Sequence, residues 1–178
     1  MTATRIDHGS AAQTTHDSDW LVYVVRHAHA GQRSDAPDDD RRTLSEQGRR
    51  EADRVAEVLA PHMSGHIVSS PFVRCVETMR PLASRLGVDV DIRAELAEGG
   101  ASPDEAMQLL ADLPERSVAC LHGDMLEGLA GRLDARGSPI EGPRSLEKGV
   151  VWVLAFRNGD CVGAEVLHAP CRDDRISH

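Results

Sequence analysis

The segment Leu21-Val22-Tyr23-Val24-Val25-Arg26-His27-Ala28-His29-Ala30-Gly31 decides the fold of this chain. Its first five residues are apolar or β-branched, which predicts a short strand buried on both faces. A basic turn that carries histidines and small residues follows this strand. In an open parallel sheet, the residues just beyond the carboxyl end of a strand line the functional crevice. We therefore expect Arg26 and His27 to lie in the functional site.

An arginine beside a histidine at the end of a strand suits phosphoryl transfer. A neutral imidazole nitrogen can attack phosphorus and carry the phosphoryl group covalently. A guanidinium group can bind two phosphoryl oxygens and offset their charge. The same dipeptide also fits a solvated basic turn, so the rest of the chain has to decide between the two interpretations.

The composition predicts one soluble globular domain. Hydrophobic residues make up 40% and charged residues 28% of the 178 residues, a length that suits one domain of ordinary size. The net charge of -9 opposes binding to nucleic acid or to an anionic membrane, and the aromatic content of 3% opposes base-stacking surfaces. No window approaches the roughly 18 apolar residues of a membrane span. The four cysteines lack CxxC spacing, which favours buried free thiols in a reducing cytoplasm.

Hydrophobic patterning divides the chain into one domain and two tails. Residues 1–19 are polar and lack the apolar region of a secretory signal, so a disordered tail is expected. Residues 20–168 carry the strand and helix patterns, and residues 169–178 are expected to fray. The polar segment 31–42 has the composition of a surface loop, and its position makes it a candidate flap over the site.

Strands and helices alternate along the predicted domain. Further strands are expected at 66–69, 88–92 and 117–121, and helices at 44–59, 70–86, 102–113 and around 125–133. An Asn-Gly pair at 158–159 predicts an antiparallel hairpin between 149–156 and 161–167. The order predicts an α/β fold, a three-layer α/β/α sandwich with a mostly parallel sheet and the C-terminal hairpin at its margin, away from the chemistry.

Sequence signals also predict where the first two helices begin and end. Thr43 or Ser45 is expected to cap the first helix. Ser70 is expected to cap the second, with Pro71 at its first position. Pro81 is expected to kink the second helix, or to follow its end.

Three more residues join the candidate site. His122 follows the buried strand at 117–121, as His27 follows the first strand, and this repetition is more informative than either histidine alone. Arg74 lies off the apolar stripe of its helix, in the first turn, where a cation is unfavourable unless an anion or an acidic neighbour compensates. Arg33, in the flap, could reach a bound phosphate or balance the aspartates near it.

Four short motifs in this order resemble branch 1 of the histidine phosphatase superfamily. They are Arg26-His27, Ser69-Ser70-Pro71-Phe72-Val73-Arg74, Leu96-Ala97-Glu98 and His122-Gly123. The segment 42–52 is similar to the small phosphohistidine-phosphatase type and to the domain appended to some actinobacterial Nudix hydrolases. Two positions depart from the family pattern, because Ala28 and His29 stand where a glycine and an acidic residue are usual.

The resemblance implies a role for each matched residue. His27 would be the nucleophile that becomes phosphorylated, Glu98 would be the proton donor, and a cationic phosphate pocket would be formed by Arg26, Arg74 and His122. The implied enzyme is a cytoplasmic hydrolase that acts on a phosphate monoester or phosphohistidine without a metal or other cofactor. Its partner would be a phosphorylated small molecule or a phosphohistidine-bearing protein.

Other functions remain open from the sequence. A mutase would return the phosphoryl group to an organic acceptor, although the short chain lacks long insertions that would enclose such a substrate. A non-catalytic phosphate-binding module could use the same fold. A metal site could be formed by His27, His29 and His122, although Arg26 and Arg74 would repel a divalent cation.

Overall fold

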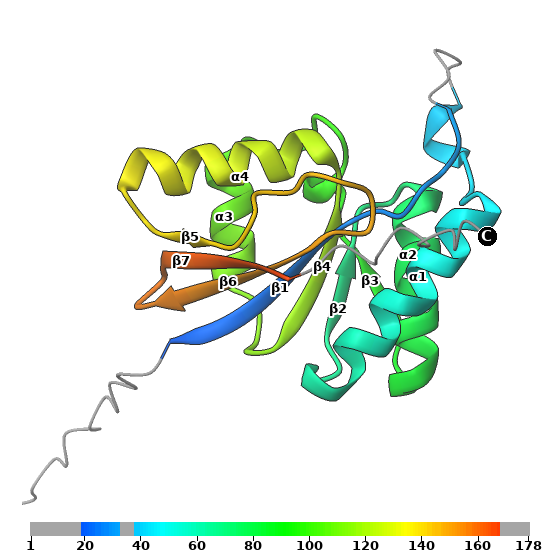
Figure 1. Cartoon of the computed structure of the whole chain (residues 1–178), viewed down its shortest axis with the longest axis horizontal. Helices are drawn as coiled ribbons and strands as arrows, with labels where there is room; N and C mark the ends of the chain where they lie inside the picture. The colour runs from blue at the N-terminus through cyan, green and yellow to red at the C-terminus, as the bar shows by residue number, and fades with distance from the viewer. Residues whose placement is uncertain (1–18, 33–37, 168–178) are drawn as a thin grey trace, which may run out of the picture.

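The computed structural model describes residues 19–32 and 38–167 (Figure 1). Arg33 and the predicted tails, apart from Asp19, lie outside these residues, so the tails and the domain boundaries stay predictions. No helix in the two described ranges is long and apolar enough to cross a bilayer.

One mixed sheet forms the centre of the described chain, with strand order β3-β2-β4-β1-β6-β7-β5. Strands β3, β2, β4 and β1 run parallel to one another, whereas β6 is antiparallel to both β1 and β7. The short β5 pairs in parallel with β7. The bounds are β1 Trp20–Arg26, β2 Ile67–Ser69, β3 Val90–Ile92, β4 Ser117–Leu121, β5 Ile140–Glu141, β6 Val151–Arg157 and β7 Asp160–Leu167.

Two layers of helices cover the two faces of the sheet (Figure 1). The helices are α1 Glu46–Leu59, α2 Val73–Leu86, α3 Pro103–Ala111 and α4 Gly123–Arg136. Val22 and Val24 of β1 pack in the core cluster that includes α3 and α4, whereas Tyr23 and Val25 pack in the cluster that includes α1 and α2. The predicted α/β fold is therefore confirmed, and β1 is buried on both faces as its sequence indicates.

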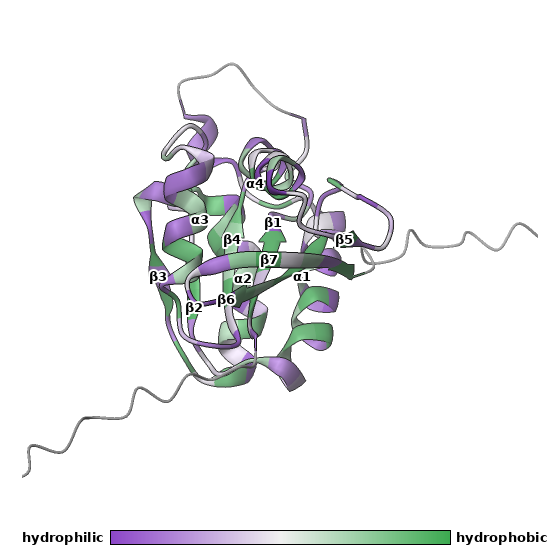
Figure 2. Cartoon of the chain, turned by 90° about the vertical axis from the view of Figure 1, so that its left-hand side faces the viewer, coloured by the Kyte–Doolittle hydropathy of each residue, from purple (hydrophilic) through white to green (hydrophobic). Residues whose placement is uncertain are grey.

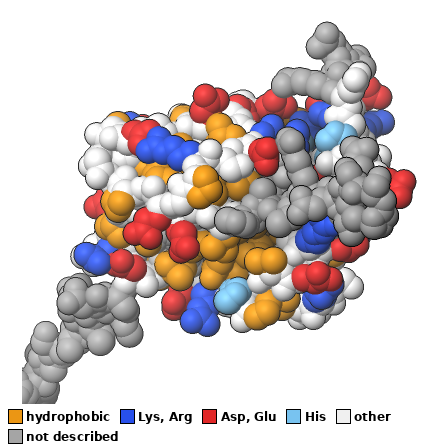
Figure 3. All heavy atoms as spheres, viewed as in Figure 1, with side chains coloured by type: hydrophobic (Ala, Val, Ile, Leu, Met, Phe, Trp, Pro, Cys, Tyr) orange, Lys and Arg blue, Asp and Glu red, His pale blue; other side chains and the backbone are white. Residues whose placement is uncertain are grey.

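Hydrophobic residues concentrate along the strands and on the helix faces that meet them (Figure 2). On the face shown in Figure 3, acidic and basic side chains are interspersed. The interspersed charges on this face are the expected surface of a globular protein, and the chemistry must be sought where charged groups are buried.

The predicted hairpin is confirmed at the margin of the sheet, where β6 and β7 pair. Asn158 and Gly159 both have positive φ values, 52° and 86°, as a type I′ turn requires. Ser45, one of the two predicted caps, accepts a hydrogen bond from the backbone of Gly48 at the start of α1. Ser102 and Glu105 form the capping box that begins α3.

The start of α2 differs from the prediction. The helix begins at Val73 with Phe72 as its N-cap, and no side chain caps it. The Ser70 hydroxyl instead accepts from Nε2–H of His122 and from the N–H of Phe72, before the helix begins. Pro81 lies inside the helix, which continues to Leu86 and ends at Gly87 in the left-handed conformation.

Candidate active site

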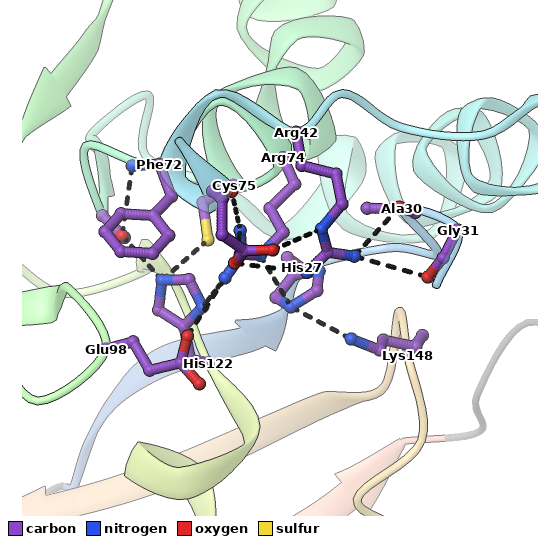
Figure 4. A network of polar contacts seen from close by, with 12 residues as sticks. His27, Ala30, Gly31, Arg42, Phe72, Arg74, Cys75, Glu98, His122 and Lys148 are labelled. Atoms are coloured by element: carbon purple, nitrogen blue, oxygen red, sulfur yellow. Dashed lines mark hydrogen bonds and ion pairs between the residues drawn. The ribbon is translucent and has the colours of Figure 1, made fainter. Parts of the chain in front are cut away.

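The sheet brings the two predicted histidines to one edge. Strands β1 and β4 are parallel neighbours with Arg26 paired to Leu121, so His27 and His122 leave the sheet side by side. The backbone N–H of His27 donates to the carbonyl of Leu121 at 3.0 Å. The two imidazole centroids lie 5.3 Å apart, and both rings are buried (Figure 4).

His27 presents an unprotonated nitrogen to the site. Its Nδ1 lies 2.8 Å from the carbonyl oxygen of Ala28, which can only accept, so Nδ1 carries the proton and Nε2 carries the lone pair. Burial, together with the nearby charge of Lys148, lowers the pKa of His27 to about 2. The ring is therefore neutral at physiological pH, which is the form that a nucleophile needs.

Arg74 connects the parts of the site, and it is almost completely buried. Its Nε donates to Nε2 of His27 at 3.3 Å, and its Nη2 lies 3.4 Å from Nδ1 of His122. Two carboxylates compensate its charge, because Nη2 lies 3.2 Å from Glu98 and Nη1 lies 3.1 Å from Asp39. These carboxylates are the acidic neighbours that a cation in the first helical turn requires.

The hydrogen bonds of His122 define its tautomer. The guanidinium of Arg74 can only donate, so Nδ1 of His122 accepts from it and Nε2 carries the proton. That Nε2–H donates to the hydroxyl of Ser70 at 2.8 Å. Phe72 packs edge-on against the ring at 4.7 Å. His122 is thus held in one orientation from three sides.

Arg26 lies beside these groups and is tightly enclosed. Its Nη1 donates to the carbonyl oxygen of Leu146, and its buried Nε has no hydrogen-bond partner among the described residues. A Cβ atom on Gly123 would come within 2.7 Å of the guanidinium carbon, so a larger residue at the start of α4 would displace the guanidinium of Arg26. Burial lowers the pKa of Arg26, although the charges of Asp124 and Glu98 oppose this effect.

Glu98 reaches the site from the loop that follows the short 3-10 helix η3 (Ala94–Leu96). Leu96 is fully buried and anchors this loop to the core. The Glu98 carboxylate and His27 both accept hydrogen bonds from the guanidinium of Arg74. Glu95, in η3, is exposed. The predicted acid is therefore positioned beside the predicted nucleophile.

The flap enters the site through residues that the sequence analysis did not single out. Asp39, in the 3-10 helix η1 (Asp39–Arg41), accepts from Nη1 of Arg74 through its backbone carbonyl at 2.8 Å. The Asp39 carboxylate also accepts from Nε of Arg42 at 2.8 Å. Arg42 in turn donates to the carbonyl of Ala30, so this segment is tied to the loop after His27.

Lys148 was also missed, and its position corrects the prediction that the region of the C-terminal hairpin lies away from the chemistry. Its Nζ lies 3.2 Å from Nε2 of His27. The residue lies three positions before β6, whose first residue, Val151, pairs with Val25. Because β6 is antiparallel to β1, the beginning of β6 meets the end of β1. Only knowledge of this pairing could have indicated Lys148.

His29 does not join the other two histidines in a metal site. Its Nδ1 lies 2.7 Å from the hydroxyl of Ser45, at the start of α1. The loop is packed so closely against α1 that a Cβ atom on Gly48 would lie 1.9 Å from the carbonyl oxygen of His29. Within residues 19–32 and 38–167, no three His, Cys, Asp or Glu side chains are grouped to hold a metal ion.

Residues 22–125, more than half of the chain, match the sequence profile of the histidine phosphatase superfamily, branch 1. The chain belongs to this superfamily. The four short motifs indicated this same branch, and that prediction is confirmed. All five residues that the resemblance selected lie in one site, whereas Arg33 lies outside the described residues.

A curated relative extends the comparison within the histidine phosphatase superfamily. An 8-oxo-(d)GTP phosphatase of Mycolicibacterium smegmatis is 31% identical over an alignment of 155 residues, and the match covers 84% of this chain and 48% of the relative. The chain thus spans about half the length of that relative.

Solved structures share the fold of this histidine phosphatase superfamily member. The SixA protein of Agrobacterium tumefaciens has a TM-score of 0.64 at 21% identity, covering 84% of this chain and 96% of that one. The protein histidine phosphatase SixA complexed with tungstate has a TM-score of 0.62 at 18% identity, covering 83% and 94%. A mycobacterial glucosyl-3-phosphoglycerate phosphatase has a TM-score of 0.60 at 19% identity, covering 83% and 96%.

Proposed function

We propose that the chain is a metal-independent phosphatase that hydrolyses a phosphate monoester or a phosphohistidine through a covalent phosphohistidine at His27. The observation that carries the proposal is the state of this ring. It is buried and neutral, it keeps its proton on Nδ1, and its Nε2 faces the donors of Arg74 and Lys148. A lone pair surrounded by cations is poised to attack the phosphorus of an anion.

In the first step, Nε2 of His27 attacks phosphorus in line with the leaving oxygen. The N–P bond forms as the P–O bond breaks. Glu98 takes up a proton from solvent when the phosphoryl group replaces it at Arg74, and it donates that proton to the departing oxygen. Arg26 and Arg74 stabilise the charge on the other phosphoryl oxygens, and His122 joins them once its Nδ1 is protonated. The phosphorylated ring gains positive charge, which strengthens the hydrogen bond from its Nδ1–H to the carbonyl of Ala28.

In the second step, water attacks the phosphohistidine from the face that the leaving group vacated. The Glu98 carboxylate, deprotonated by the first step, takes a proton from the water. The N–P bond breaks, the electron pair returns to Nε2, and inorganic phosphate is released. His27 is then again the neutral tautomer with which the cycle began.

The cations of the site supply the electrostatic stabilisation that a metal ion would otherwise provide. We therefore expect activity to survive exhaustive treatment with EDTA. A loss of turnover that one metal ion restores would contradict this part of the proposal. A phosphorylated organic product formed from an added acceptor would indicate a mutase, and phosphate binding without turnover would indicate a binding module.

The substrate class is supported by chemistry and by similarity. A panel should contain an alkyl phosphate, p-nitrophenyl phosphate, phosphohistidine and a phosphohistidine-bearing protein. A nucleoside triphosphate belongs in the panel because the relative from Mycolicibacterium smegmatis is an 8-oxo-(d)GTP phosphatase. We place the protein in the cytoplasm, since Cys75, Cys120 and Cys161 are buried free thiols.

The direct test is to trap the phosphorylated enzyme during turnover. Quenched wild-type protein should carry a label that is labile in acid and survives alkali, as expected for a P–N bond, and His27→Asn should carry none. His66→Gln is the matched control, because His66 lies just before β2, at the amino end of the parallel strands and away from the site at their carboxyl ends. Full activity in His27→Asn would overturn the proposal.

A further inference from the structure

Lys148 is the sole lysine of the chain. Every other member of its 20 basic Lys and Arg residues is an arginine. This one ammonium group lies 3.2 Å from the nitrogen that attacks phosphorus in the proposed function, and Figure 4 shows it opposite Arg74 across the ring of His27. Lysine is a compact point charge with three donors, whereas arginine is a broad planar fork. A crowded site beside a nucleophile suits the smaller group.

The backbone holds Lys148 next to His27. The N–H of Gly149 donates to the carbonyl of Arg26 at 3.1 Å and to that of His27 at 3.3 Å. Gly149 has a φ of 73°, in the left-handed region that glycine adopts most readily. The loop is therefore fixed to the backbone of His27 itself, which places the Cα of Lys148 close to the ring that its ammonium meets.

The groups around Lys148 are mostly cationic, and they suit the binding of an anion. Among the described residues, no carboxylate lies within salt-bridge distance of its Nζ. The group is half-buried, and the nearby cations are Arg26, Arg42 and Arg74. Burial and these charges lower the pKa of Lys148 to about 8. An ammonium in this position is unfavourable alone and becomes favourable when a phosphoryl group arrives.

Geometry assigns the part of the phosphoryl group that Lys148 can reach. Nε2 of His27 has one lone pair, and both Nε of Arg74 and Nζ of Lys148 donate toward it. When phosphorus takes that lone pair, the two donors flank the new N–P bond and face the equatorial oxygens. The leaving oxygen lies on the far side of phosphorus in an in-line transfer, beyond the reach of a group beside Nε2.

We propose that Lys148 is a catalytic residue that binds an equatorial phosphoryl oxygen in the transition states of both transfer steps. This inference rests on the proposed function. It adds Lys148 to the four residues that contact the phosphoryl group there, which are Arg26, His27, Arg74 and His122. It also separates two roles, because Lys148 stabilises charge on the nucleophile side while Glu98 donates the proton on the leaving-group side.

The kinetic test compares Lys148→Met, Lys148→Arg and a control in the same loop. Lys148→Met should lower kcat/KM by roughly 10² to 10³, as expected when a charged contact to the transition state is lost. Lys148→Arg should recover part of this loss. Arg144→Gln should behave as wild type, because Arg144 is exposed and paired with Asp134. Melting temperatures verify that each variant folds.

The pH profile provides a readout that a structural role would not change. The charged and titratable groups around Lys148 are those of Arg26, His27, Arg42, Arg74 and Cys75. The protonated amine is the active form, so kcat/KM of the wild type should fall as the pH rises through about 8. Lys148→Arg should move this falling limb upward, since guanidinium stays charged. An unchanged limb in Lys148→Arg would overturn the inference.

Chemical labelling tests the contact without turnover. Pyridoxal phosphate carries an aldehyde and a phosphate, and borohydride reduction of its imine should label Lys148 as the only lysine. Peptide mapping separates this adduct from one at the amino terminus. Tungstate should protect Lys148, and Lys148→Met should bind tungstate at least tenfold more weakly than wild type. Labelling that tungstate does not affect would overturn the inference.

These experiments distinguish failure of the inference about Lys148 from failure of the proposed function. If the wild type forms a phosphohistidine but Lys148→Met keeps its kcat/KM and its tungstate affinity, the function stands and the role of Lys148 is wrong. If the wild type hydrolyses no substrate in the panel and forms no phosphohistidine, the proposed function fails. In that case the proposed role of Lys148 in the transition states is overturned as well. Tungstate binding still shows whether Lys148 binds an oxyanion.

Discussion

At the scale of single residues, the site works through protonation states that hydrogen-bond geometry imposes. His27 keeps its proton on Nδ1 because a carbonyl oxygen faces that nitrogen. His122 has the opposite tautomer because an arginine faces its Nδ1. One imidazole therefore presents a lone pair on Nε2 and the other an N–H on Nε2, although both follow a parallel strand and both are buried.

The role of Glu98 depends on the basicity of the leaving group. Glu98→Gln should slow the hydrolysis of an alkyl phosphate by roughly 10² or more, because an alkoxide leaves poorly without a proton. The same change should barely affect p-nitrophenyl phosphate, whose phenolate is stable. Phosphohistidine should lie between them, since its imidazole can leave already protonated on the other nitrogen. Steady-state kinetics on the three substrates measures this dependence.

Glu95 is the matched control for this experiment. It lies three residues before Glu98, it is exposed, and it is on the short helix η3. Glu95→Gln should show no dependence on the leaving group. Equal and small effects of Glu98→Gln on all three substrates would mean that this carboxylate only compensates the charge of Arg74.

At the scale of elements, helix η1 of the flap competes with substrate for the guanidinium of Arg74, which belongs to α2. Helix η1 contributes a carbonyl and a carboxylate of Asp39 to Nη1 of Arg74. In the proposed mechanism, the phosphoryl group binds the same guanidinium. The Asp39 carboxylate thus occupies part of the position of an anion, and substrate must displace it or share the arginine with it.

Removing the charge of Asp39 should therefore strengthen anion binding. Asp39→Asn should lower KM and the inhibition constant of inorganic phosphate by roughly threefold to tenfold, the scale of a partly exposed charge contact. The turnover number kcat should change less, because Arg74 keeps its contacts with His27 and His122. Inhibition by phosphate at fixed pH and ionic strength provides the measurement.

Asp40 serves as the comparison, because it is the next residue of η1 and is exposed. Asp40→Asn removes the same charge from the same element without touching Arg74. A drop in KM of equal size in both variants would show that general electrostatics, and not the contact with Arg74, governs affinity. An increase in KM for Asp39→Asn would show instead that the carboxylate holds Arg74 in its binding position.

At the scale of the whole molecule, the protein combines an acidic surface balance with a buried cationic site. The net charge is -9, yet Arg26, Arg74 and Lys148 converge on the two histidines. Folding must therefore bring like charges together. The free energy of unfolding should carry the cost of this arrangement as a dependence on pH.

His27 gives that dependence a sign. The pKa of His27 is lowered to about 2 in the folded state, chiefly by burial, against an ordinary value of 6.5. Between these values the unfolded chain binds a proton that the folded chain does not, so stability is lost as the pH falls below about 6.5. The slope from this one group is at most about 1.4 kcal/mol per pH unit.

Urea unfolding between about pH 7 and pH 5 measures this slope. His27→Asn should have a shallower dependence than the wild type, because asparagine does not titrate. His66→Asn removes a histidine outside the site and is the control for a general loss of one imidazole. If His27→Asn and the wild type lose stability in parallel, the burial of a neutral ring is not the source of the acid sensitivity.

The sequence by itself determined the elements that depend on local patterns. The apolar run before Arg26 specifies a doubly buried strand, and the Asn158-Gly159 pair specifies the hairpin turn. The hydroxyls of Ser45 and Ser102 cap their helices, because each accepts a hydrogen bond from the backbone N–H three residues further along. Because parallel strands align their carboxyl ends, the sequence also indicated that His27 and His122 would meet.

Only the tertiary structure decided which other groups complete the site. Ser70 satisfies the criteria for a helix cap, but its hydroxyl bonds to a histidine 52 positions away. Lys148 meets His27 across 121 positions, through an antiparallel pairing between β1 and β6 that no local pattern specifies. Local propensity acts over a few residues, whereas the register of a sheet follows from packing the whole core. That packing brings the sole lysine to His27.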